Sequence, residues 1–381
     1  MKILHIINSL NRGGAEMMLY QLLSHLDRSE CELSVVSLMG DEGLGEDIRA
    51  LGIPVYSVGM RRIGPSPVAL MRARKLLRSI EADIIHGWLY YGSLAASLGR
   101  QWGLTKARVL WSIHHGLSDL QGDKWRTRRA IARLAKMSGK PSRIVYCSMT
   151  SAEQHEAARF SSENRVVIPN GFDCEKFHFS EKARREIRQE LGIGNDKLVV
   201  GHLGRWHPVK NQVMFLEAAA MLLERKKEVS FVMAGIGVDP ANPAIKEMIS
   251  DHPQLEGRVH LLGERCDISR LLSGMDILAL SSLAESFPLV VGEAMACAVP
   301  CVVTDVGDCA RIVGASGVVV PSGDTLAFLN GMEALLDIPE EERKSAGESA
   351  RARIIEKFGL TKVVGNFEKL YMDVLTEGGD A

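Results

Sequence analysis

The 381-residue sequence lacks the marks of membrane-spanning and disulfide-rich proteins. It has no apolar run near the ~18 residues that a membrane span requires. The apolar start over residues 3–7 soon meets Asn8 and Arg12, so we expect a first strand there and not a signal peptide. The seven cysteines are odd in number and form no Cys-x-x-Cys, which argues against a disulfide framework and a zinc knuckle. We therefore expect a protein of the reducing cytoplasm.

Signatures of bound cofactors are also missing. There is no Asp-x-Asp triplet and no cluster of His and Cys residues, so we expect no metal requirement. The stretch Ala234-Gly235-Ile236-Gly237 lacks the third glycine of the dinucleotide fingerprint Gly-x-Gly-x-x-Gly. This argues against a nicotinamide dehydrogenase. We expect no resident cofactor.

The net charge of −1 hides an uneven distribution of charge along the chain. Residues 1–170 carry 23 Lys and Arg against 15 Asp and Glu, whereas residues 171–381 carry 23 against 32. Most of the positive excess lies in residues 61–143, with 17 basic and 4 acidic side chains. Such a patch attracts an anionic lipid or an anionic ligand. The alternative is an ordinary solvated basic surface.

Short apolar, β-branched runs alternate with helical stretches along the whole chain, which predicts parallel sheets covered by helices, an α/β fold. The expected strands lie at residues 2–7, 33–38, 53–58, 83–86, 108–113, 143–147, 165–168, 198–203, 229–234, 258–262, 276–281, 300–303 and 317–320. Thirteen strands are too many for one comfortable open sheet, and the pattern restarts at about 198 after a turn-rich, charged stretch. The sequence therefore predicts two doubly wound domains.

In an open α/β sheet, ligands bind beyond the carboxyl ends of the strands, so the residues after each strand are the candidates for a site. The first strand is followed by Gly13-Gly14-Ala15-Glu16 and a helical pattern. Paired glycines let backbone N–H groups approach a phosphate at a helix N-terminus. A plain structural turn is the alternative explanation of this pair.

Two cations follow the strand at 198–203. Arg205 stands just after it, Pro208 suits the first position of a helix, and Lys210 lies in the expected opening turn. A helix start already carries partial positive charge, so two cations there are explained best by an anion such as a diphosphate between them. The alternative is that both basic side chains are simply exposed to solvent and bind no ligand.

Two glutamates follow the strand at 276–281. Pro288 as the first helical residue places Glu285 on a loop and Glu293 inside a helix, so that both can face one pocket. A carboxylate accepts charge-assisted hydrogen bonds from several sugar hydroxyls. A glycosidase pair is the rival interpretation, but nothing in the sequence specifies the separation or the protonated partner that hydrolysis requires.

These motifs resemble, in order and over nearly the whole chain, the retaining GT-B glycosyltransferases of the group 1, family 4 type. The matching pieces are Gly13-Gly14-Ala15-Glu16, Ser112-Ile113-His114, Val167-Ile168-Pro169-Asn170-Gly171-Phe172-Asp173, Gly204-Arg205 with Lys210, and the stretch from Glu285 to Glu293 that continues into residues 300–307. The resemblance implies two Rossmann-like domains facing a central cleft. It places an acceptor-side domain at 1–170, a nucleotide-sugar domain at 171–359, and a closing helix at 360–381 that returns to the first domain.

The resemblance also implies roles for single residues. Arg205 and Lys210 would neutralise the donor diphosphate, Glu293 would bind the nucleotide ribose, and Glu285 would contact the transferred sugar. His114 would lie beside that sugar, and Gly13 and Gly14 near the phosphates. The remaining donor contacts would come from the base-binding loop with Gly263 and Asp267, and from backbone N–H groups along Ser286, Phe287, Pro288 and Leu289.

The implied reaction is transfer of a hexosyl-type sugar from a uridine or guanosine diphosphate sugar to a growing surface glycan or its lipid-linked precursor, with retention and without metal. A nucleotide-sugar epimerase and a non-catalytic nucleotide-sugar-binding protein remain as alternatives. We expect no nucleic-acid partner. Two residues depart from the family pattern: Ser286 and Ala298 stand where glycine is usual, and Ala298 predicts a turn without a strongly positive φ.

The basic segment 124–143 has the pattern of a basic amphipathic helix around Trp125, Ile131, Leu134 and Met137. Because such enzymes often act on lipid-linked acceptors, peripheral contact with the inner, anionic leaflet is one hypothesis. An ordinary core helix with a basic exposed side is the other.

Overall fold

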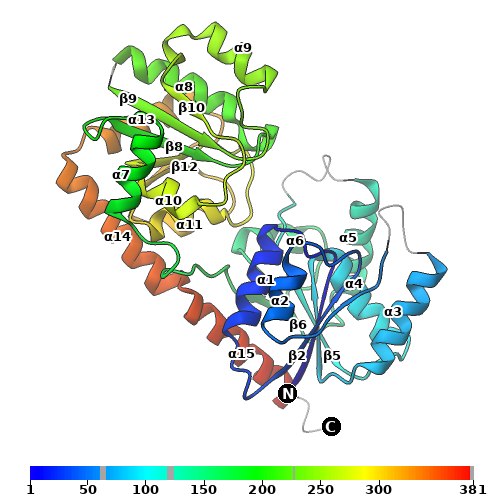
Figure 1. The fold of residues 1–381 in the computed structure, drawn as a ribbon. Coiled ribbons are helices and arrows are strands. Elements are labelled where there is room, and N and C mark those ends of the chain that lie inside the picture. The colour runs from blue at the N-terminus through cyan, green and yellow to red at the C-terminus, as the bar shows by residue number, and fades with distance from the viewer. Residues whose placement is uncertain (61–65, 118–123, 226–227, 378–381) are drawn as a thin grey trace. The chain divides into compact units, whose positions relative to one another are not determined.

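The computed structural model describes residues 1–60, 66–117, 124–225 and 228–377. The chain divides into two compact units: unit 1 is Met1–Gly171 with Leu360–Ala381, and unit 2 is Phe172–Gly359. All thirteen predicted strand positions carry strands, and every pairing between them is parallel. The predicted α/β class with two doubly wound sheets is therefore confirmed (Figure 1).

Unit 1 contains a seven-stranded sheet with the order β3-β2-β1-β4-β5-β6-β7. Its strands are β1 (Lys2–Ile7), β2 (Glu32–Ser37), β3 (Val55–Ser57), β4 (Ile84–Trp88), β5 (Arg108–Ile113), β6 (Arg143–Tyr146) and β7 (Arg165–Val167). Its helices are α1 (Gly14–His25), α2 (Leu44–Ala50), α3 (Pro67–Ser79), α4 (Leu89–Gln101), α5 (Trp125–Met137), α6 (Met149–Ala157) and α15 (Leu360–Thr376).

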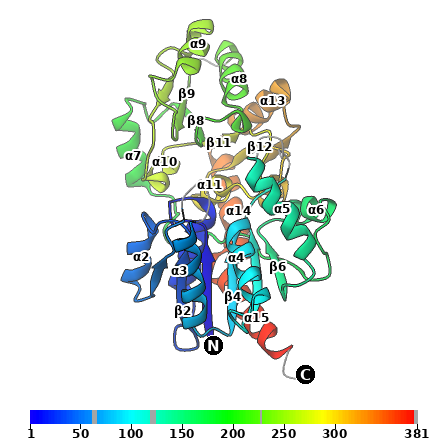
Figure 2. The same cartoon turned by 90° about the vertical axis from the view of Figure 1, so that its right-hand side faces the viewer.

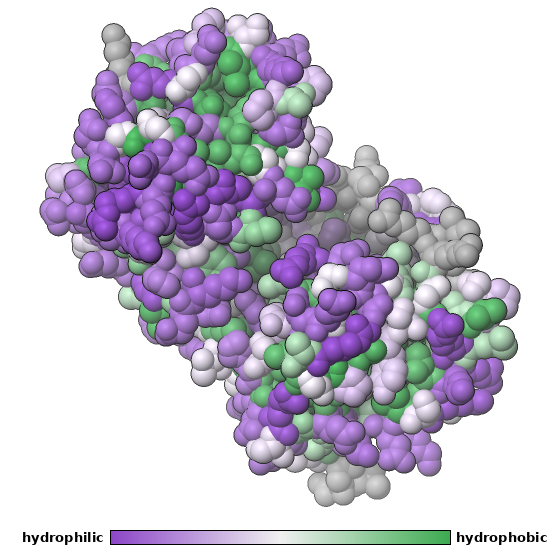
Figure 3. Space-filling model, viewed as in Figure 1, coloured by the Kyte–Doolittle hydropathy of each residue, from purple (hydrophilic) through white to green (hydrophobic). Residues whose placement is uncertain are grey.

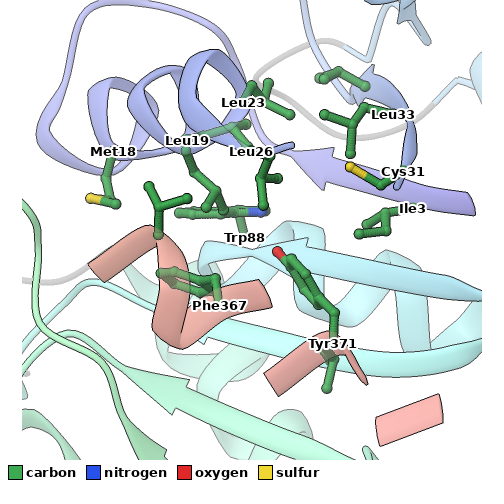
Figure 4. Packing of buried hydrophobic residues seen from close by; sticks show 14 of the residues in the cluster. Ile3, Met18, Leu19, Leu23, Leu26, Cys31, Leu33, Trp88, Phe367 and Tyr371 are labelled. Carbon is green, nitrogen blue, oxygen red and sulfur yellow. The ribbon is translucent and has the colours of Figure 1, made fainter. Parts of the chain in front are cut away.

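Two apolar cores cover the two faces of this sheet. One core joins the sheet to α1, α2 and α15, and the other joins it to α3, α4, α5 and α6. Phe367 and Tyr371 of α15 pack beside Trp88 in the first of these cores (Figure 4). The Tyr371 hydroxyl also hydrogen-bonds the His86 Nδ1 atom at 2.9 Å. The predicted return of the C-terminal helix to the first domain is confirmed.

Unit 2 contains a six-stranded sheet with the order β10-β9-β8-β11-β12-β13. Its strands are β8 (Leu198–Leu203), β9 (Val229–Ala234), β10 (Val259–Leu261), β11 (Ile277–Leu280), β12 (Cys301–Thr304) and β13 (Val318–Val320). Its helices are α7 (Glu181–Glu190), η1 (Pro208–Lys210), α8 (Gln212–Arg225), α9 (Pro243–Asp251), η2 (Pro253–Leu255), α10 (Ile268–Ser273), α11 (Leu289–Ala296), α12 (Cys309–Val313), α13 (Thr325–Leu336) and α14 (Glu340–Phe358). Among the described residues, no helix is both long and apolar enough to cross a bilayer.

The turn after α11 corrects one expectation. Ala298 has a φ of +56°, in the left-handed region that the alanine was expected to avoid. The turn closes as a Schellman motif, in which the Val299 N–H donates to the Ala294 carbonyl and the Ala298 N–H to the Met295 carbonyl, both at 2.9 Å. These hydrogen bonds hold the alanine in a conformation that glycine would adopt without steric cost.

Replacing Ala298 by glycine is expected to stabilise unit 2. The left-handed conformation costs alanine about 1–2 kcal/mol, and glycine removes this cost. Glycine also makes the unfolded chain more flexible, which offsets about 0.4–1 kcal/mol of the stabilisation. The net effect is a rise of roughly 0.5–1 kcal/mol in the free energy of unfolding, measured by urea denaturation. Val299→Gly serves as the matched control and should destabilise, because Val299 is buried and has no positive φ. An Ala298→Gly variant less stable than the parent would contradict this account.

Candidate active site

The loops after β8 and β11 meet at the topological switch point of unit 2. These two strands are neighbours in the sheet, but the chain leaves β8 toward β9 and reaches β11 only after β10. In such sheets the crevice between the diverging connections is where ligands bind. The Leu283 N–H donates to the Val209 carbonyl at 2.7 Å, which ties the two loops together.

Lys210 and Glu285 form an ion pair at this point. The Lys210 Nζ lies 2.5 Å from the Glu285 Oε1, and the Ser282 hydroxyl donates to the same oxygen at 2.7 Å. Both charged side chains are mostly buried, with exposed fractions of 22% and 12%. The structure thus brings together one cation and one acid of the predicted set, with Ser282 as a partner that the motif analysis had not assigned.

Lys210 does not lie in the opening turn of a long helix, as Pro208 had suggested. Pro208–Lys210 form a separate 3-10 turn, Asn211 follows with a φ of +49°, and α8 begins at Gln212. The Ser281 hydroxyl donates to the Lys210 and Asn211 carbonyls at 2.9 Å each, and this contact across the sheet fixes the extra turn.

Arg205 is the free cation of this pair of loops. Its backbone carbonyl accepts a hydrogen bond from the Gln212 side-chain amide at 2.7 Å, which fixes the start of the loop. Its side chain is exposed and forms no ion pair or hydrogen bond with the described residues. An arginine held at the backbone but free at the guanidinium is suited to a bidentate contact with phosphate oxygens.

Two glycines permit the close packing of these loops. A Cβ on Gly235 would lie 2.1 Å from the Gly204 carbonyl oxygen, and a Cβ on Gly307 would lie 2.5 Å from the Glu285 carbonyl oxygen. Both glycines have positive φ values, +147° and +56°. Larger residues at these positions would push the backbone of the Arg205 and Glu285 loops out of place.

Helix α11 begins beside Glu285 with no side-chain cap. Pro288 is its N-cap residue and Leu289 its first helical residue, one position later than expected. Phe287 is buried among Phe172 and Phe358, so it anchors the loop and offers a ligand only its backbone. The first N–H groups of an uncapped helix, together with the helix dipole, form a site for an anion.

Glu293 lies one turn into α11. Its side chain makes no hydrogen bond to the described residues, and burial raises the pKa of Glu293 to about 7, an effect that Lys176 partly offsets. A half-buried carboxyl without a protein partner has hydrogen-bonding capacity left for the hydroxyls of a ligand.

The raised pKa of Glu293 predicts a pH-dependent stability. Between the unfolded value near 4.5 and about 7 the folded chain keeps a proton that the unfolded chain releases, so this residue's contribution to stability falls as the pH rises through that window. Glu293→Gln lacks this titrating group. The free energy of unfolding of the parent should therefore fall by roughly 2 kcal/mol more than that of Glu293→Gln between pH 5 and pH 8. Urea denaturation at a series of pH values measures it, and two parallel profiles would contradict the assignment.

The loop after β10 presents backbone where a base-binding loop was predicted. Gly263 has a φ of +64°, with open space where a Cβ would lie, and its carbonyl accepts from the Gly235 N–H at 2.7 Å. The carboxylate of Asp267 is engaged by Arg265 at 2.7–2.8 Å and by Arg270 at 3.0 Å, which holds the pKa of Asp267 well below its usual range. The two arginines therefore hold the Asp267 carboxylate within this loop, and its contact with a ligand stays a prediction.

In unit 1 the paired glycines lie at the start of α1. Gly13 is the N-cap residue in an extended conformation and lacks a side-chain cap, and Gly14 is the first helical residue. A Cβ on Gly13 would lie 2.5 Å from the Glu16 carboxyl, a flexible side-chain end that can move aside, and Gly13 has no positive φ. Arg12 pairs with Asp47 of α2 at 3.1 Å and fixes the loop. Gly13 and Gly14 thus form a structural turn, and the same backbone could also bind a phosphate, so both interpretations of the glycine pair stay open.

His114 follows β5 directly and stacks on Trp88, the last residue of β4, with ring centroids 5.1 Å apart and planes 13° apart. Both ring nitrogens are buried, and neither makes a hydrogen bond of normal geometry to a described residue. Burial lowers the pKa of His114 to about 4, although the neighbouring Asn170 partly counteracts this shift. His114 is thus a neutral imidazole at physiological pH.

Trp88 and Asn170 are site residues that the sequence analysis did not assign. Trp88 donates from Nε1 to the His5 Nδ1 at 3.0 Å, which fixes the indole against His114. Asn170 is 5% exposed, and its Oδ1 has no partner among the described residues. Asn170 could have been identified from the sequence, because it is a polar residue within the family-like stretch Val167–Asp173. No feature of the sequence pointed to Trp88.

No group of three or more His, Cys, Asp or Glu side chains in the described ranges is arranged to hold a metal ion. The cations at the switch point are the side chains of Arg205 and Lys210.

Comparison with known families matches both units. The model for "Glycosyltransferase Family 4" matches residues 12–176, and the model for "Glycosyl transferases group 1" matches residues 197–337. The chain is 28% identical over 315 residues to the putative glycosyltransferase EpsF of Bacillus subtilis, covering 80% of this chain and 79% of that protein. It is 28% identical over 211 residues to the Escherichia coli UDP-Gal:alpha-D-GlcNAc-diphosphoundecaprenol alpha-1,3-galactosyltransferase, covering 55% and 54%.

Among solved structures, Anabaena HepE in complex with UDP superposes with a TM-score of 0.83 at 22% identity, over 98% of this chain and all of that one. The fold is thus that of GT-B enzymes, with a Rossmann-like sheet in each unit. The family models between them span most of both units. The chain belongs to the group 1, family 4 glycosyltransferases.

Proposed function

We propose that this glycosyltransferase moves a hexosyl-type sugar from a nucleotide-diphosphate sugar to a glycan or lipid-linked acceptor, with retention and without a metal ion. The observation that carries the proposal is the arrangement at the switch point of unit 2. One free cation, Arg205, follows β8, and Lys210 of the same loop pairs with Glu285 of the loop that leads into the uncapped start of α11. A diphosphate joined to a sugar needs both charges and hydroxyl acceptors.

Within unit 2 each group has a chemical task. Arg205, Lys210 and the first N–H groups of α11 neutralise the negative diphosphate, and so supply the positive charge that a metal ion supplies in other enzymes. Glu293 accepts hydrogen bonds from the ribose hydroxyls, and Glu285 accepts them from the transferred sugar. Because a ribose donor favours the ionised carboxylate, nucleotide binding should lower the pKa of Glu293 and release a proton.

The reaction breaks the bond between the anomeric carbon and the donor phosphate oxygen, and the phosphate leaves with the bonding electrons. The acceptor hydroxyl attacks the same face, and its proton passes to the leaving phosphate oxygen. No side-chain nucleophile takes part. The protein's contribution is preorganised positive charge at the leaving phosphate.

Unit 1 is proposed to hold the acceptor side. His114 is neutral, so it can hydrogen-bond a sugar hydroxyl but does not stabilise the departing phosphate by charge. Its stacking on Trp88 sets the direction of the ring edge. The glycine turn before α1 has no side-chain cap, so its backbone N–H groups are available to an anion.

The names of related proteins favour uridine and lipid-linked acceptors. Structures of HepE contain UDP and UDP-glucose. The relative from Escherichia coli uses UDP-Gal and an undecaprenyl-diphosphate sugar, and the Campylobacter jejuni relative, 26% identical over 322 residues, is named for transfer to an undecaprenyl-diphosphate sugar as well. A UDP-hexose and a polyprenyl-diphosphate sugar are therefore the first substrates to test.

The test has two steps. A thermal-shift screen of nucleotide sugars identifies the donor, since a ligand at 100 times its dissociation constant adds about 2.7 kcal/mol of stability. The donor is then incubated with and without acceptor in excess chelator, and the anomeric configuration of the product is assigned by NMR. An α-linked product from an α-linked donor supports the proposal. An isomerised donor without acceptor indicates an epimerase, binding without any product indicates a non-catalytic protein, and loss of activity in chelator contradicts metal independence.

A further inference from the structure

Three neighbouring helices on one side of the unit 1 sheet carry basic side chains and no acidic ones, whereas the fourth helix on that side, α6, carries Glu153 and Glu156. Helices α3, α4 and α5 cover the same side of the sheet, with α4 between the other two (Figure 2). Their sequences contain ten Lys and Arg and no Asp or Glu: Arg72, Arg74, Lys75 and Arg78 in α3, Arg100 in α4, and Arg126, Arg128, Arg129, Arg133 and Lys136 in α5. We call this surface the basic face. The helices on the opposite side differ: α2 and α15 carry both signs, and α1 carries one Glu and no Lys or Arg.

The basic face also exposes apolar side chains. Val68, Leu70 and Met71 in the first turn of α3 are 60%, 46% and 65% exposed, and Trp125 at the start of α5 is 56% exposed. Tyr91 of α4 and Trp102, directly after α4, are exposed as well. These six residues are most of the eight large apolar residues that are exposed in the described part of unit 1. Exposed apolar residues gathered on one face mark an interaction surface.

Helix α3 is held to the protein by a narrow stripe. Only Ala69 and Leu77 are buried, and Met71 points away from that stripe because it lies roughly 160° from Ala69 around the helix. Green, apolar atoms appear at the end of unit 1 where α3 begins (Figure 3). Arg74, Lys75 and Arg78 continue the same outer side and form no salt bridge with described residues. The outer side of α3 is thus apolar in its first turn and basic in the rest.

We propose that the basic face docks unit 1 on an anionic lipid bilayer, with the first turn of α3 and Trp125 entering the headgroup region. Basic side chains attract the anionic headgroups, and aliphatic and indole side chains gain by leaving water at the interface. A nucleic acid would use the same charges but would gain nothing from exposed Val68, Leu70 and Met71. The apolar side chains therefore favour a bilayer over a soluble polyanion.

Two shallow hollows on the basic face are lined by basic and apolar side chains. One, about 400 Å³, is lined by Met71, Arg74, Lys75, Arg78 and Ser79 of α3. The other, about 570 Å³, lies between α4 and α5 and has Tyr91, Trp125, Arg129 and Lys136 in its wall. The Arg126 and Arg129 guanidinium groups lie 5.3 Å and 5.6 Å from the Trp125 ring centroid, so the indole and its cations form one unit. Of the predicted segment 124–143 only Trp125–Met137 is helical; Ile131, Leu134 and Met137 form its buried side as expected, Trp125 is exposed, and α3 extends the basic surface.

Docking is independent of sugar transfer, so vesicle binding tests it directly. The full chain is floated with vesicles of phosphatidylcholine alone or mixed with phosphatidylglycerol, at low and high salt. We expect about tenfold stronger binding to the mixed vesicles, weakened by salt. The variant Val68→Ser with Leu70→Ser and Met71→Ser, and the variant Lys75→Glu with Arg78→Glu, should each lose at least about tenfold of that binding.

Matched variants on the opposite helix α15 keep the test specific. Met372→Ser is as exposed as Trp125, and Lys369→Glu reverses an exposed charge; neither should change vesicle binding. Circular dichroism and thermal unfolding confirm that each variant is folded, and Trp125→Phe should lower the quenching of tryptophan fluorescence by brominated lipid. Equal binding to both vesicle types overturns the proposal. So does binding that the serine variant of α3 leaves unchanged, because it indicates a general polyanion surface.

Discussion

Lys210→Ala lowers kcat/KM for sugar transfer by about 10²- to 10³-fold, the loss expected when one preorganised charge is removed from a developing oxyanion. It also lowers the free energy of unfolding by roughly 1–3 kcal/mol, because the mostly buried Glu285 loses its counter-ion and keeps, among the described residues, the hydrogen bond from Ser282. The two effects have separate causes, the lost contact with phosphate and the lost counter-ion. Steady-state kinetics and urea denaturation measure them.

The Lys210→Arg variant separates the two causes, because it keeps the charge but changes the shape of the cation. It should retain most of the stability and less of the rate. Arg185→Ala breaks an exposed pair with Glu181 and should change both quantities little. A Lys210→Ala enzyme with full activity would remove Lys210 from the proposed site, whatever its stability.

Arg205→Ala is expected to lower kcat/KM by a similar 10²- to 10³-fold while leaving stability within about 0.5 kcal/mol of the parent. The difference follows from the structure: the Arg205 side chain is exposed and makes no hydrogen bond or ion pair with a described residue, so its removal breaks no polar contact there. Loss of affinity for the nucleoside diphosphate should account for much of the effect, and calorimetric titration with UDP measures that share.

Lys246→Ala provides the control for Arg205→Ala, because Lys246 is an exposed cation of α9 in the same unit. It should bind UDP and turn over as the parent does. Unchanged affinity and turnover in Arg205→Ala would contradict the placement of a diphosphate at the switch point. Loss of stability in that variant would instead show a structural role for the guanidinium.

Most of the secondary structure could be predicted, because parallel strands that are buried on both faces have short runs of β-branched residues in their sequence. The strand Leu198–Leu203 and the run Val229–Ala234 have the predicted bounds. Local turns were predicted less well. Ala298 adopts a positive φ because the Schellman hydrogen bonds impose it, and α8 begins after Asn211 because Ser281 from another strand holds the preceding carbonyls.

The candidate site shows the same division. Residues after strands were identifiable from their positions, since the carboxyl ends of parallel strands share one edge. The sequence did not show which of these residues contact one another. Lys210 meets Glu285, 75 positions further along the chain, because β8 pairs with β11. The stacking of Trp88 on His114 likewise depends on the pairing of β4 with β5.

By itself the sequence determined the α/β class, the two sheets and the residues at their carboxyl ends, since these follow from the order and periodicity of apolar residues. Only the tertiary structure decided that Lys210 is neutralised while Arg205 is free, and that α3 leaves Met71 in solvent. Charge pairing and exposure depend on what packs against a side chain, and those neighbours come from distant parts of the chain.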